Sequence, residues 1–320
     1  MVSILESLRP VIDSANFVRI DDEALTKFCN TLRESELTQA QAPYYSCPEG
    51  SSREQDVALS IVFNALNFCF WGEPKWKATI DWQEYSGSEG TVKSLIHSVQ
   101  NGLNILNPQI LKNLTEEQLH EVFKGNTVIP LFAERLSLLR DLGTVVLEKY
   151  DGKFSLIIDQ AAGDALKIIE LLATDFPKVF NDVAMYRGHQ VQFFKRAQLV
   201  PIDLYLQSLM KPNFFTITNI EHMTALADYN IPMVLREYGI VVYAPELAHK
   251  IDNKIEIDSG SEEEIEIRAS MIWSIEKMKL YLQKKFPLLT ASQVSDIFWF
   301  RRKEFKQTGR PPHRTRTIWY

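Results

Sequence analysis

The sequence predicts a mainly α-helical protein with one small β-hairpin. Apolar residues recur at helical spacing over most of the 320 residues. The hydrophobic content of 45% is enough to bury a large core. The strand–helix alternation of a doubly wound sheet is missing from the pattern. We expect one domain over residues 1–320 and leave open a division into two helical lobes.

Predicted helices cover both halves of the chain. The segment 3–14 is short and amphipathic, and 21–34 opens with acidic residues that favour a helix N-terminus. Residues 53–71 are apolar on almost every side, which predicts a buried helix or a helix that ends at the aromatic cluster. The segment 115–123 begins with a capping box. The remaining predicted helices are 91–102, 129–147, 154–161, 163–176, 195–209, 219–229, 231–238, 262–286 and 291–305.

Two segments alternate in the manner of strands. Residues 183–194 predict a hairpin with its turn at Arg187 and Gly188, and residues 75–85 predict a strand or an extended loop. Among the helices, 262–286 is the longest and the most clearly amphipathic. The tail 309–320 contains Gly, Pro and Arg residues, and we expect it to lie on the surface as an extended strap.

Charge and cysteine content narrow the class of function. The formal net charge of −6 argues against a large nucleic-acid footprint, because phosphate contacts need a basic face. It fits a small anionic ligand held by a few basic side chains. Cys29, Cys47 and Cys69 show no metal-binding spacing and indicate free thiols in a reducing compartment. With no secretory signal and no apolar run near ~18 residues, we expect a cytoplasmic protein without a membrane span.

Three short stretches are rich in residues that carry chemistry, although motifs for nucleotide loops, serine hydrolases and zinc proteases are missing. We therefore expect no metal catalysis. Residues 67–71 (NFCFW) either belong to the hydrophobic core or form a platform on which a heterocycle stacks. Residues 193–198 (FFKRAQ) are a helix start or a phosphate contact. Asp228 caps the next helix or presents a carboxylate to a cleft. Each stretch alone favours the structural interpretation.

Together these stretches resemble the queuosine salvage proteins, which are queuosine-nucleotide N-glycosylases. The resemblance covers nearly the whole chain and implies an all-helical fold similar to DNA glycosylases. It implies hydrolysis of the N-glycosidic bond of queuosine 5′-monophosphate, which releases queuine for salvage without a cofactor. The matching stretches, in family order, are LNFCFW (66–71), IPLFAERLSLLRDLG (129–143), FFKRAQLV (193–200), MTALADYNIP (223–232), EIEIRASMIW (264–273), the region of Trp299, and PHRTRTIWY (312–320).

The resemblance also implies a site, with Asp228 as the catalytic carboxylate. Cleavage builds positive charge on the ribose, and a buried carboxylate stabilises that charge or activates the attacking water. Lys195 and Arg196 would meet the 5′-phosphate, and Asp296 would pair with the cationic amine of queuine. Further substrate contacts are expected from the following residues: Asn67, Phe68, Phe70, Trp71, Gln198, Tyr229, Trp299 and His313.

Some positions depart from the family pattern or have a weaker assignment. The family commonly has Arg and Gln where this chain has Asn230 and Met233, which affects base recognition more than the carboxylate. Arg268 is expected to be a structural ion-pair partner rather than a ligand contact.

Two other functions compete with the glycosylase. One is a non-enzymatic helical protein that binds a modified nucleoside or tRNA, although the acidic charge weighs against tRNA. The other is a DNA-repair glycosylase, which only fold analogy suggests. We expect a small nucleotide as the ligand, and no DNA.

Overall fold

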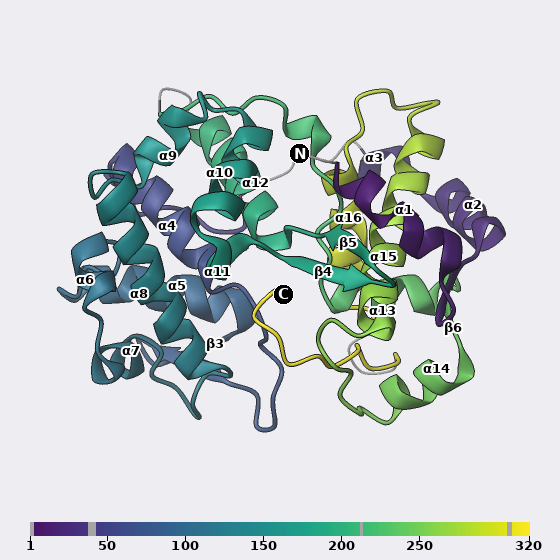
Figure 1. Cartoon of the computed structure of the whole chain (residues 1–320), viewed down its shortest axis with the longest axis horizontal. Coiled ribbons are helices and arrows are strands. Elements are labelled where there is room, and N and C mark those ends of the chain that lie inside the picture. Colours follow the sequence, from purple (N-terminus) through teal and green to yellow (C-terminus); the bar gives the residue numbers. More distant parts are fainter. Residues whose placement is uncertain (1–2, 38–42, 212–213, 306–308) are drawn as a thin grey trace.

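The computed structural model describes residues 3–37, 43–211, 214–305 and 309–320 (Figure 1). Helices dominate these residues, and the described strands form three small antiparallel pairs. The predicted mainly α-helical fold is therefore confirmed. None of the described helices combines the length and the apolar composition that crossing a bilayer requires.

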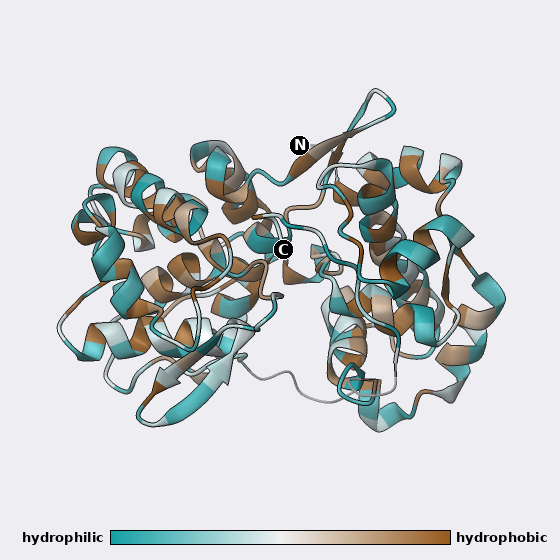
Figure 2. Ribbon diagram, turned by 90° about the horizontal axis from the view of Figure 1, so that it is seen from below, coloured by the Kyte–Doolittle hydropathy of each residue, from teal (hydrophilic) through white to brown (hydrophobic). Residues whose placement is uncertain are grey.

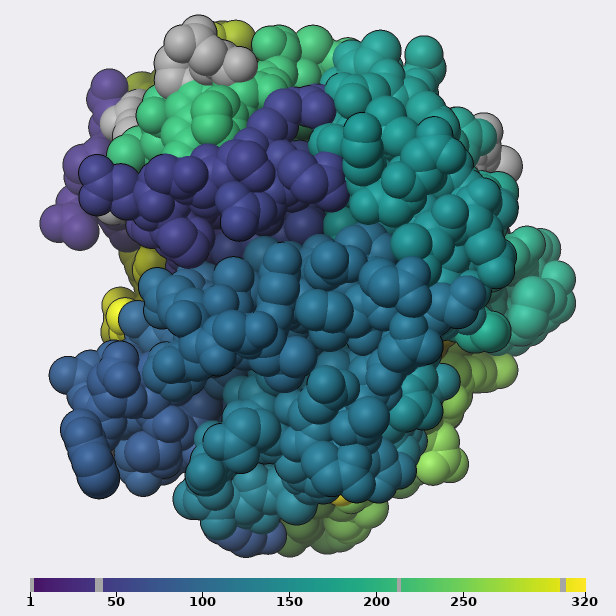
Figure 3. Space-filling view, turned by 90° about the vertical axis from the view of Figure 1, so that its left-hand side faces the viewer, coloured from purple at the N-terminus to yellow at the C-terminus, as the bar shows by residue number. Residues whose placement is uncertain are grey.

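The first lobe lies on the left in Figure 1, and its core contains buried residues between Tyr45 and Met223. Its blue and teal segments form most of the surface seen in Figure 3. Its elements are α4 (Arg53–Ala65), β2 (Lys77–Ile80), β3 (Gln83–Ser86), α5 (Gly87–Gln100), α6 (Pro108–Lys112), α7 (Glu116–Val122), α8 (Phe132–Lys149), α9 (Ser155–Gln160), α10 (Ala165–Asp175), α11 (Pro177–Phe180), α12 (Lys195–Met210) and the 3-10 turn η1 (Ile220–His222).

Close packing of two helices in this lobe requires a glycine. Helices α6 and α8 touch at Gly143, where a Cβ atom would lie 2.6 Å from the Pro108 carbonyl oxygen and 2.6 Å from the Lys112 nitrogen. A glycine lets the two backbones approach that closely.

The second lobe combines two separate parts of the chain. Its early elements are α1 (Ile4–Ser14), β1 (Val18–Ile20), α2 (Asp22–Thr31) and α3 (Glu34–Leu37). Its late elements are α13 (Asn230–Glu237), β6 (Val241–Tyr243), α14 (Pro245–Asp252), α15 (Glu262–Leu282) and α16 (Ala291–Arg301). Strand β1 pairs antiparallel with β6, so both parts share one small sheet and one hydrophobic core.

Helix α15 lies at the centre of the second core, with buried residues on all its sides. The buried carboxylate of Glu266 accepts hydrogen bonds from the backbone N–H groups of Asn16 (3.0 Å), Phe17 (2.6 Å) and Val18 (3.0 Å). The hydroxyl of Tyr186 donates to the same carboxylate at 2.9 Å. This one side chain therefore fixes the start of β1 against the later half of the chain.

A β-hairpin and the C-terminal tail are two of the described segments that connect the lobes. The hairpin of β4 (Val183–Tyr186) and β5 (His189–Gln192) reaches from the first lobe to the second (Figure 1). Asp182, just before β4, forms a buried ion pair with Arg268 of α15. Residues 309–320 run between the lobes, and the C-terminal end lies centrally in Figure 2. There the backbone N–H of Cys69 donates to the carbonyl of Tyr320 at 2.8 Å.

Several local predictions are confirmed. The turn at Arg187 and Gly188 joins β4 to β5, and residues 75–85 contain most of the second hairpin, β2–β3. The capping box at the start of α7 is present, with Thr115 and Gln118 bonded to each other's backbone N–H groups. Figure 2 shows that most helices carry both hydrophobic and hydrophilic residues, which is the pattern behind these predictions.

The helix that begins at residue 53 ends at Ala65, directly before the aromatic cluster, which matches the second of the two predicted alternatives. Buried guanidinium groups bind backbone carbonyls at this point: Arg196 binds the carbonyl of Ala65 and Arg135 that of Leu66. The helix predicted over 219–229 is only the turn η1, since the side chain of Gln198 binds the backbone N–H of Thr224 at 2.8 Å.

Other predictions fail for lack of tertiary information. Helix α15 is not clearly amphipathic, because its polar residues have partners inside the core. The tail is extended as predicted but lies only partly on the surface, since His313 and Tyr320 are each 2% exposed whereas Arg310 and Arg316 are exposed. The sequence pattern did not reveal the β1–β6 pair or the helices α3, α6, α11 and α14.

The Glu266 contacts give a stability prediction. Glu266→Ala leaves several backbone N–H groups without an acceptor, at about 1–3 kcal/mol for each buried one. We expect the free energy of unfolding in urea to fall by at least about 3 kcal/mol. The control is Glu262→Ala on the same helix, which loses a half-exposed pair with Arg187 and should cost less than about 1 kcal/mol. Equal losses in the two variants would contradict this role.

Candidate active site

Two adjoining cavities lie between the lobes. The outer cavity has a volume of about 800 Å³ and the inner cavity about 210 Å³. Segments of both lobes line each of them. The residues that line both cavities mark their junction: Asn67, Ser88, Glu89, Lys195, Asp228, Trp299 and Arg302.

Asp228 lies at this junction, in the loop before α13, and its side chain is almost fully buried. Its Oδ1 accepts hydrogen bonds from the backbone N–H groups of Asn230 (3.0 Å) and Ile231 (2.8 Å), so it does cap α13. The same carboxyl group lines both cavities, so capping and a role in the cleft are compatible. Burial raises the pKa of Asp228, and the charge of Lys195 opposes this rise.

Lys195 is the first residue of α12 and lies at the junction near Asp228. The residue before it, Phe194, has a left-handed backbone with φ of 48°, which costs a residue with a side chain roughly 1–2 kcal/mol. This sharp turn starts α12 with Lys195 facing the cavities. Burial lowers the pKa of Lys195 to about 8, and the Asp228 charge opposes the shift.

Gln198, one turn further along α12, holds the loop that carries Asp228. Its side-chain nitrogen donates to Thr224 Oγ1 at 3.0 Å and to the Phe193 carbonyl at 3.1 Å. Its side-chain oxygen accepts from the Thr224 backbone N–H. Gln198 is fully buried and outside the lining of both cavities, so it positions the loop instead of touching a ligand.

The aromatic stretch 66–71 divides between core and cavity. Arg135 is fully buried and donates to the carbonyls of Leu66 and Phe68. The ring of Phe68 is buried against Arg135, whose guanidinium carbon lies 4.2 Å from the ring centre. Phe70 and Trp71 instead line the outer cavity. With its backbone bound by Arg135, the stretch therefore places the rings of Phe70 and Trp71 at the cleft and the ring of Phe68 in the core.

Two further rings contribute from the second lobe. Trp299 of α16 lines both cavities, and the guanidinium carbon of Arg302 lies 3.6 Å from the centre of its ring. Tyr229 lines the outer cavity beside Asp228. Together with Phe70 and Trp71 they give flat apolar walls of the kind on which a heterocycle stacks.

Asp296 and His313 complete the predicted set. Asp296 lines the inner cavity and accepts a hydrogen bond from the Tyr44 hydroxyl at 2.9 Å. His313 lines the outer cavity, with its Nε2 3.2 Å from the Tyr320 hydroxyl. Burial lowers the pKa of His313 to about 3, and the charge of Arg268 adds to this, so the imidazole is neutral.

The two cavities have opposite charge. The inner cavity is lined by more acidic than basic side chains: Glu89, Asp203, Asp228 and Asp296 against Lys195 and Arg302. The outer cavity is mainly basic: Lys75, Lys195, Lys254, Arg302, Lys303, Arg310 and Arg314 against Glu73, Glu89 and Asp228. A ligand with a cation at one end and an anion at the other would fit this polarity, with its middle beside Asp228.

Comparison with known proteins identifies the family. The family model described as queuosine salvage protein matches residues 47–320. The chain belongs to this family of queuosine salvage proteins. A queuosine 5′-phosphate N-glycosylase/hydrolase of Sphaerobacter thermophilus is 34% identical, over 100% of this chain and 98% of the relative. A protein of the same name from Dictyostelium discoideum is 32% identical, over 95% of this chain and 94% of the relative. Another from Mus musculus is 28% identical, over 98% of this chain and 98% of the relative.

In this queuosine salvage protein, three residues expected at the ligand do not line either cavity: Phe68, Arg196 and Gln198. Arg196 was expected at the phosphate, but it is 2% exposed and donates to the carbonyls of Ala65 and Val179. The hydrogen bonds of the Arg196 side chain therefore link the end of α4 to α11. Arg268, expected to be structural, is paired with Asp182 and Glu264.

Several residues that line the cavities were not predicted from the sequence, among them Tyr44, Glu89, Asp203 and Arg302. A signal was available for Asp203, since an acid in the middle of an otherwise apolar helical stretch is unusual. The other three carry no local signal, because only the approach of the two lobes brings them to the cleft.

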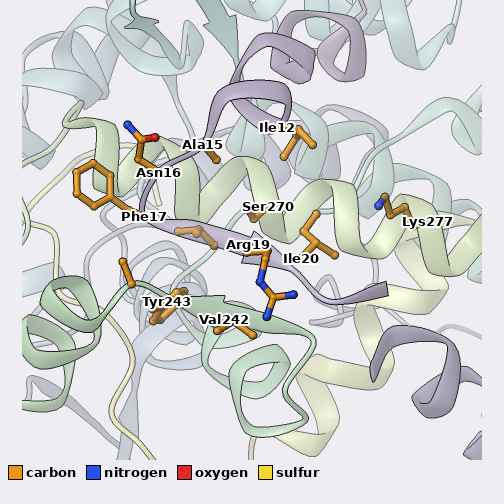
Figure 4. Close-up of a pocket in the computed structure, with 12 residues that line it drawn as sticks. Ile12, Ala15, Asn16, Phe17, Arg19, Ile20, Val242, Tyr243, Ser270 and Lys277 are labelled. Atoms are coloured by element: carbon orange, nitrogen blue, oxygen red, sulfur yellow. The ribbon is translucent and has the colours of Figure 1, made fainter. Parts of the chain in front are cut away.

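A third cavity of about 510 Å³ lies beside β1 and β6 in the second lobe (Figure 4). Its described lining includes no Asp, Glu or His side chain. Its cations, Arg19 and Lys277, already pair with Asp21 and Asp22. It therefore lacks the acid–base groups found between the lobes. Among the described residues, no group of three or more His, Cys, Asp or Glu side chains has the arrangement of metal ligands.

The contrast between Lys195 and Arg196 gives a second stability prediction. Arg196→Met leaves buried carbonyls unpaired and should lower the free energy of unfolding by about 3–5 kcal/mol. Lys195→Met removes a cation that burial already disfavours, so stability should change by less than about 1 kcal/mol. Urea unfolding of the two neighbouring variants measures both. A loss for Lys195→Met as large as that for Arg196→Met would contradict the assignment.

Proposed function

We propose that this protein hydrolyses the N-glycosidic bond of queuosine 5′-monophosphate and releases queuine. The opposite charge of the two adjoining cavities is the observation that carries the proposal. The relatives' shared name, queuosine 5′-phosphate N-glycosylase/hydrolase, points to the same reaction. The activity is that of a hydrolase acting on N-glycosyl bonds.

The substrate has the polarity that the cavities require. Its 5′-phosphate is an anion, which suits the basic outer cavity. Its base carries a secondary ammonium group, which suits the acidic inner cavity. If each end takes its matching cavity, the ribose and the glycosidic bond lie at the junction, beside Asp228.

At the junction, Asp228 would act on the ribose. Bond cleavage develops positive charge on the sugar, and a buried carboxylate stabilises that charge or takes a proton from the attacking water. Burial raises the pKa of Asp228, which makes its carboxylate a stronger base toward the attacking water. Queuine lacks the N7 atom that acids protonate in purines, so positioning and charge stabilisation carry more of the barrier.

The remaining predicted residues take binding roles in this proposal. Phe70, Trp71, Tyr229 and Trp299 would stack on the base or the ribose. Asp296 would pair with the ammonium group, and Asn67 and the neutral imidazole of His313 would offer hydrogen bonds. Lys195 would meet the phosphate, with Arg302 at the same junction in place of Arg196.

We infer that the two lobes act as one domain, because both line each cavity. We also infer a cytoplasmic location, since Cys29, Cys47 and Cys69 are free thiols.

Asp228→Asn tests the mechanism. The amide keeps an oxygen to cap α13, so the fold should survive while the negative charge is lost. We expect kcat for queuine release from queuosine 5′-monophosphate to fall at least about 100-fold, with substrate binding retained. Mass spectrometry of the released base measures the rate.

The matched control is Asp56→Asn. Asp56 is a buried aspartate that pairs with Lys211 outside both cavities, so turnover of its folded fraction should stay close to that of the unaltered protein. Near-normal turnover by Asp228→Asn would remove that residue from the mechanism. Salt-sensitive tRNA binding without base release would favour a binding protein instead.

The pKa of Lys195 predicts a pH dependence. Its lowered pKa of about 8 means that the ammonium form is present below that pH and is lost as the pH rises through it. KM for the nucleotide should therefore rise above pH about 8, while KM for the nucleoside, which has no phosphate, should not. Lys195→Arg stays charged and should remove the rise. An equal pH dependence for nucleotide and nucleoside would contradict a phosphate contact.

A further inference from the structure

The inner cavity is lined by a carboxylate that the mechanism above does not use. Asp203 of α12 is 2% exposed and lines the inner cavity but not the outer one. Its Oδ2 accepts a hydrogen bond from Nδ2 of Asn64 at 2.7 Å. Its Oδ1 is buried and has no hydrogen-bond partner among the described residues.

Tyr45 lines the same cavity, and its buried hydroxyl faces Asp203. The pair makes no hydrogen bond of regular geometry, but the interaction with Tyr45 lowers the pKa of Asp203 against the effect of burial. Buried polar atoms without a well-formed hydrogen bond are rare in native proteins. A ligand in the inner cavity that donates to Asp203 would complete the hydrogen bonding of this pair.

Helix geometry places Asp203 relative to the junction. Lys195, Leu199 and Asp203 are spaced four residues apart, so they follow one face of α12, and all three line the inner cavity. The rise of an α-helix puts Asp203 about 12 Å along the axis from Lys195. Asp203 therefore lies at the end of the inner cavity that is remote from the outer cavity.

The base offers a matching edge. A 7-deazaguanine carries two donors side by side on its six-membered ring, N1–H and the 2-amino group, away from the glycosidic nitrogen and the C7 substituent. With the ribose beside Asp228, this edge enters the inner cavity first. A carboxylate accepts two parallel N–H donors well. Burial also raises the pKa of Asp203 to about 7, so bound donors would favour its charged form.

We propose that Asp203 is the specificity-determining residue that recognises the guanine-type edge, accepting hydrogen bonds from N1–H and the 2-amino group. The second hydrogen of that amino group then faces the Tyr45 hydroxyl. This inference rests on the proposed function, because the base class comes from it. An adenine-type edge presents an acceptor at N1 and would be rejected by the carboxylate.

The test measures base preference by titration calorimetry, without hydrolysis. The probes are 7-deazaguanine and 7-deazahypoxanthine, which lacks only the 2-amino group. The unaltered protein should bind 7-deazaguanine at least about 10-fold more tightly, as expected for one hydrogen bond to a charged group. Asp203→Asn, of equal size, should reduce this preference to less than about 3-fold. Asp296→Asn, on the same cavity, should keep the preference.

A structural role for Asp203 predicts a different result. If its second oxygen only serves the Tyr45 hydroxyl, Asp203→Asn and Tyr45→Phe would lower the unfolding midpoint and leave the base preference unchanged. That outcome, or no preference in the unaltered protein, overturns the proposal. Because binding of the free bases needs no catalysis, failure to hydrolyse the nucleotide would remove the proposed function and still leave a clear result for Asp203.

Discussion

The buried ion pair between Arg268 and Asp182 joins the two lobes, and the cleft between them depends on it. Both charges are almost fully removed from water, so each needs the other, and Glu264 adds a second anion to Arg268 at 3.2 Å. The guanidinium carbon also lies 3.7 Å from the ring centre of Phe193 and 4.6 Å from that of Tyr320. One cation thus holds together the hairpin connection, α15 and the tail, the segments that fix how far apart the lobes stand.

Buried guanidinium groups repeat this function within the first lobe. Arg135 and Arg196 take the backbone carbonyls around the end of α4, which stops the helix and lets the aromatic stretch turn toward the cleft. Gln198 does the same for the loop that carries Asp228. Contacts between side chains and backbone therefore hold most of the segments that carry the residues lining the cavities.

Sequence patterns predicted the elements whose signals are local. Helical spacing, the capping box at Thr115 and the turn at Gly188 all depend on neighbouring residues, and these predictions are confirmed. The helix over 219–229 was wrong because a distant glutamine competes for its backbone. The tail was predicted to lie on the surface because its Arg and Pro residues are typical of one, whereas the space between the lobes buries part of it, including His313 and Tyr320. Arg196 shows the same limit, since a basic pair beside aromatics does not reveal which partner faces the ligand.

The pairing of β1 with β6 has a consequence for biosynthesis. The backbone N–H of Asn16 binds Glu266, 250 residues later, whereas the fully buried residues of the first core all lie between Tyr45 and Met223. As the nascent chain leaves the ribosome, the first lobe can close early, while helices α1 to α3 must wait for α15 to emerge. Closing so long a loop costs entropy before any contact forms, so assembly of the second core should be the slow stage. The cleft, which needs both lobes, forms last.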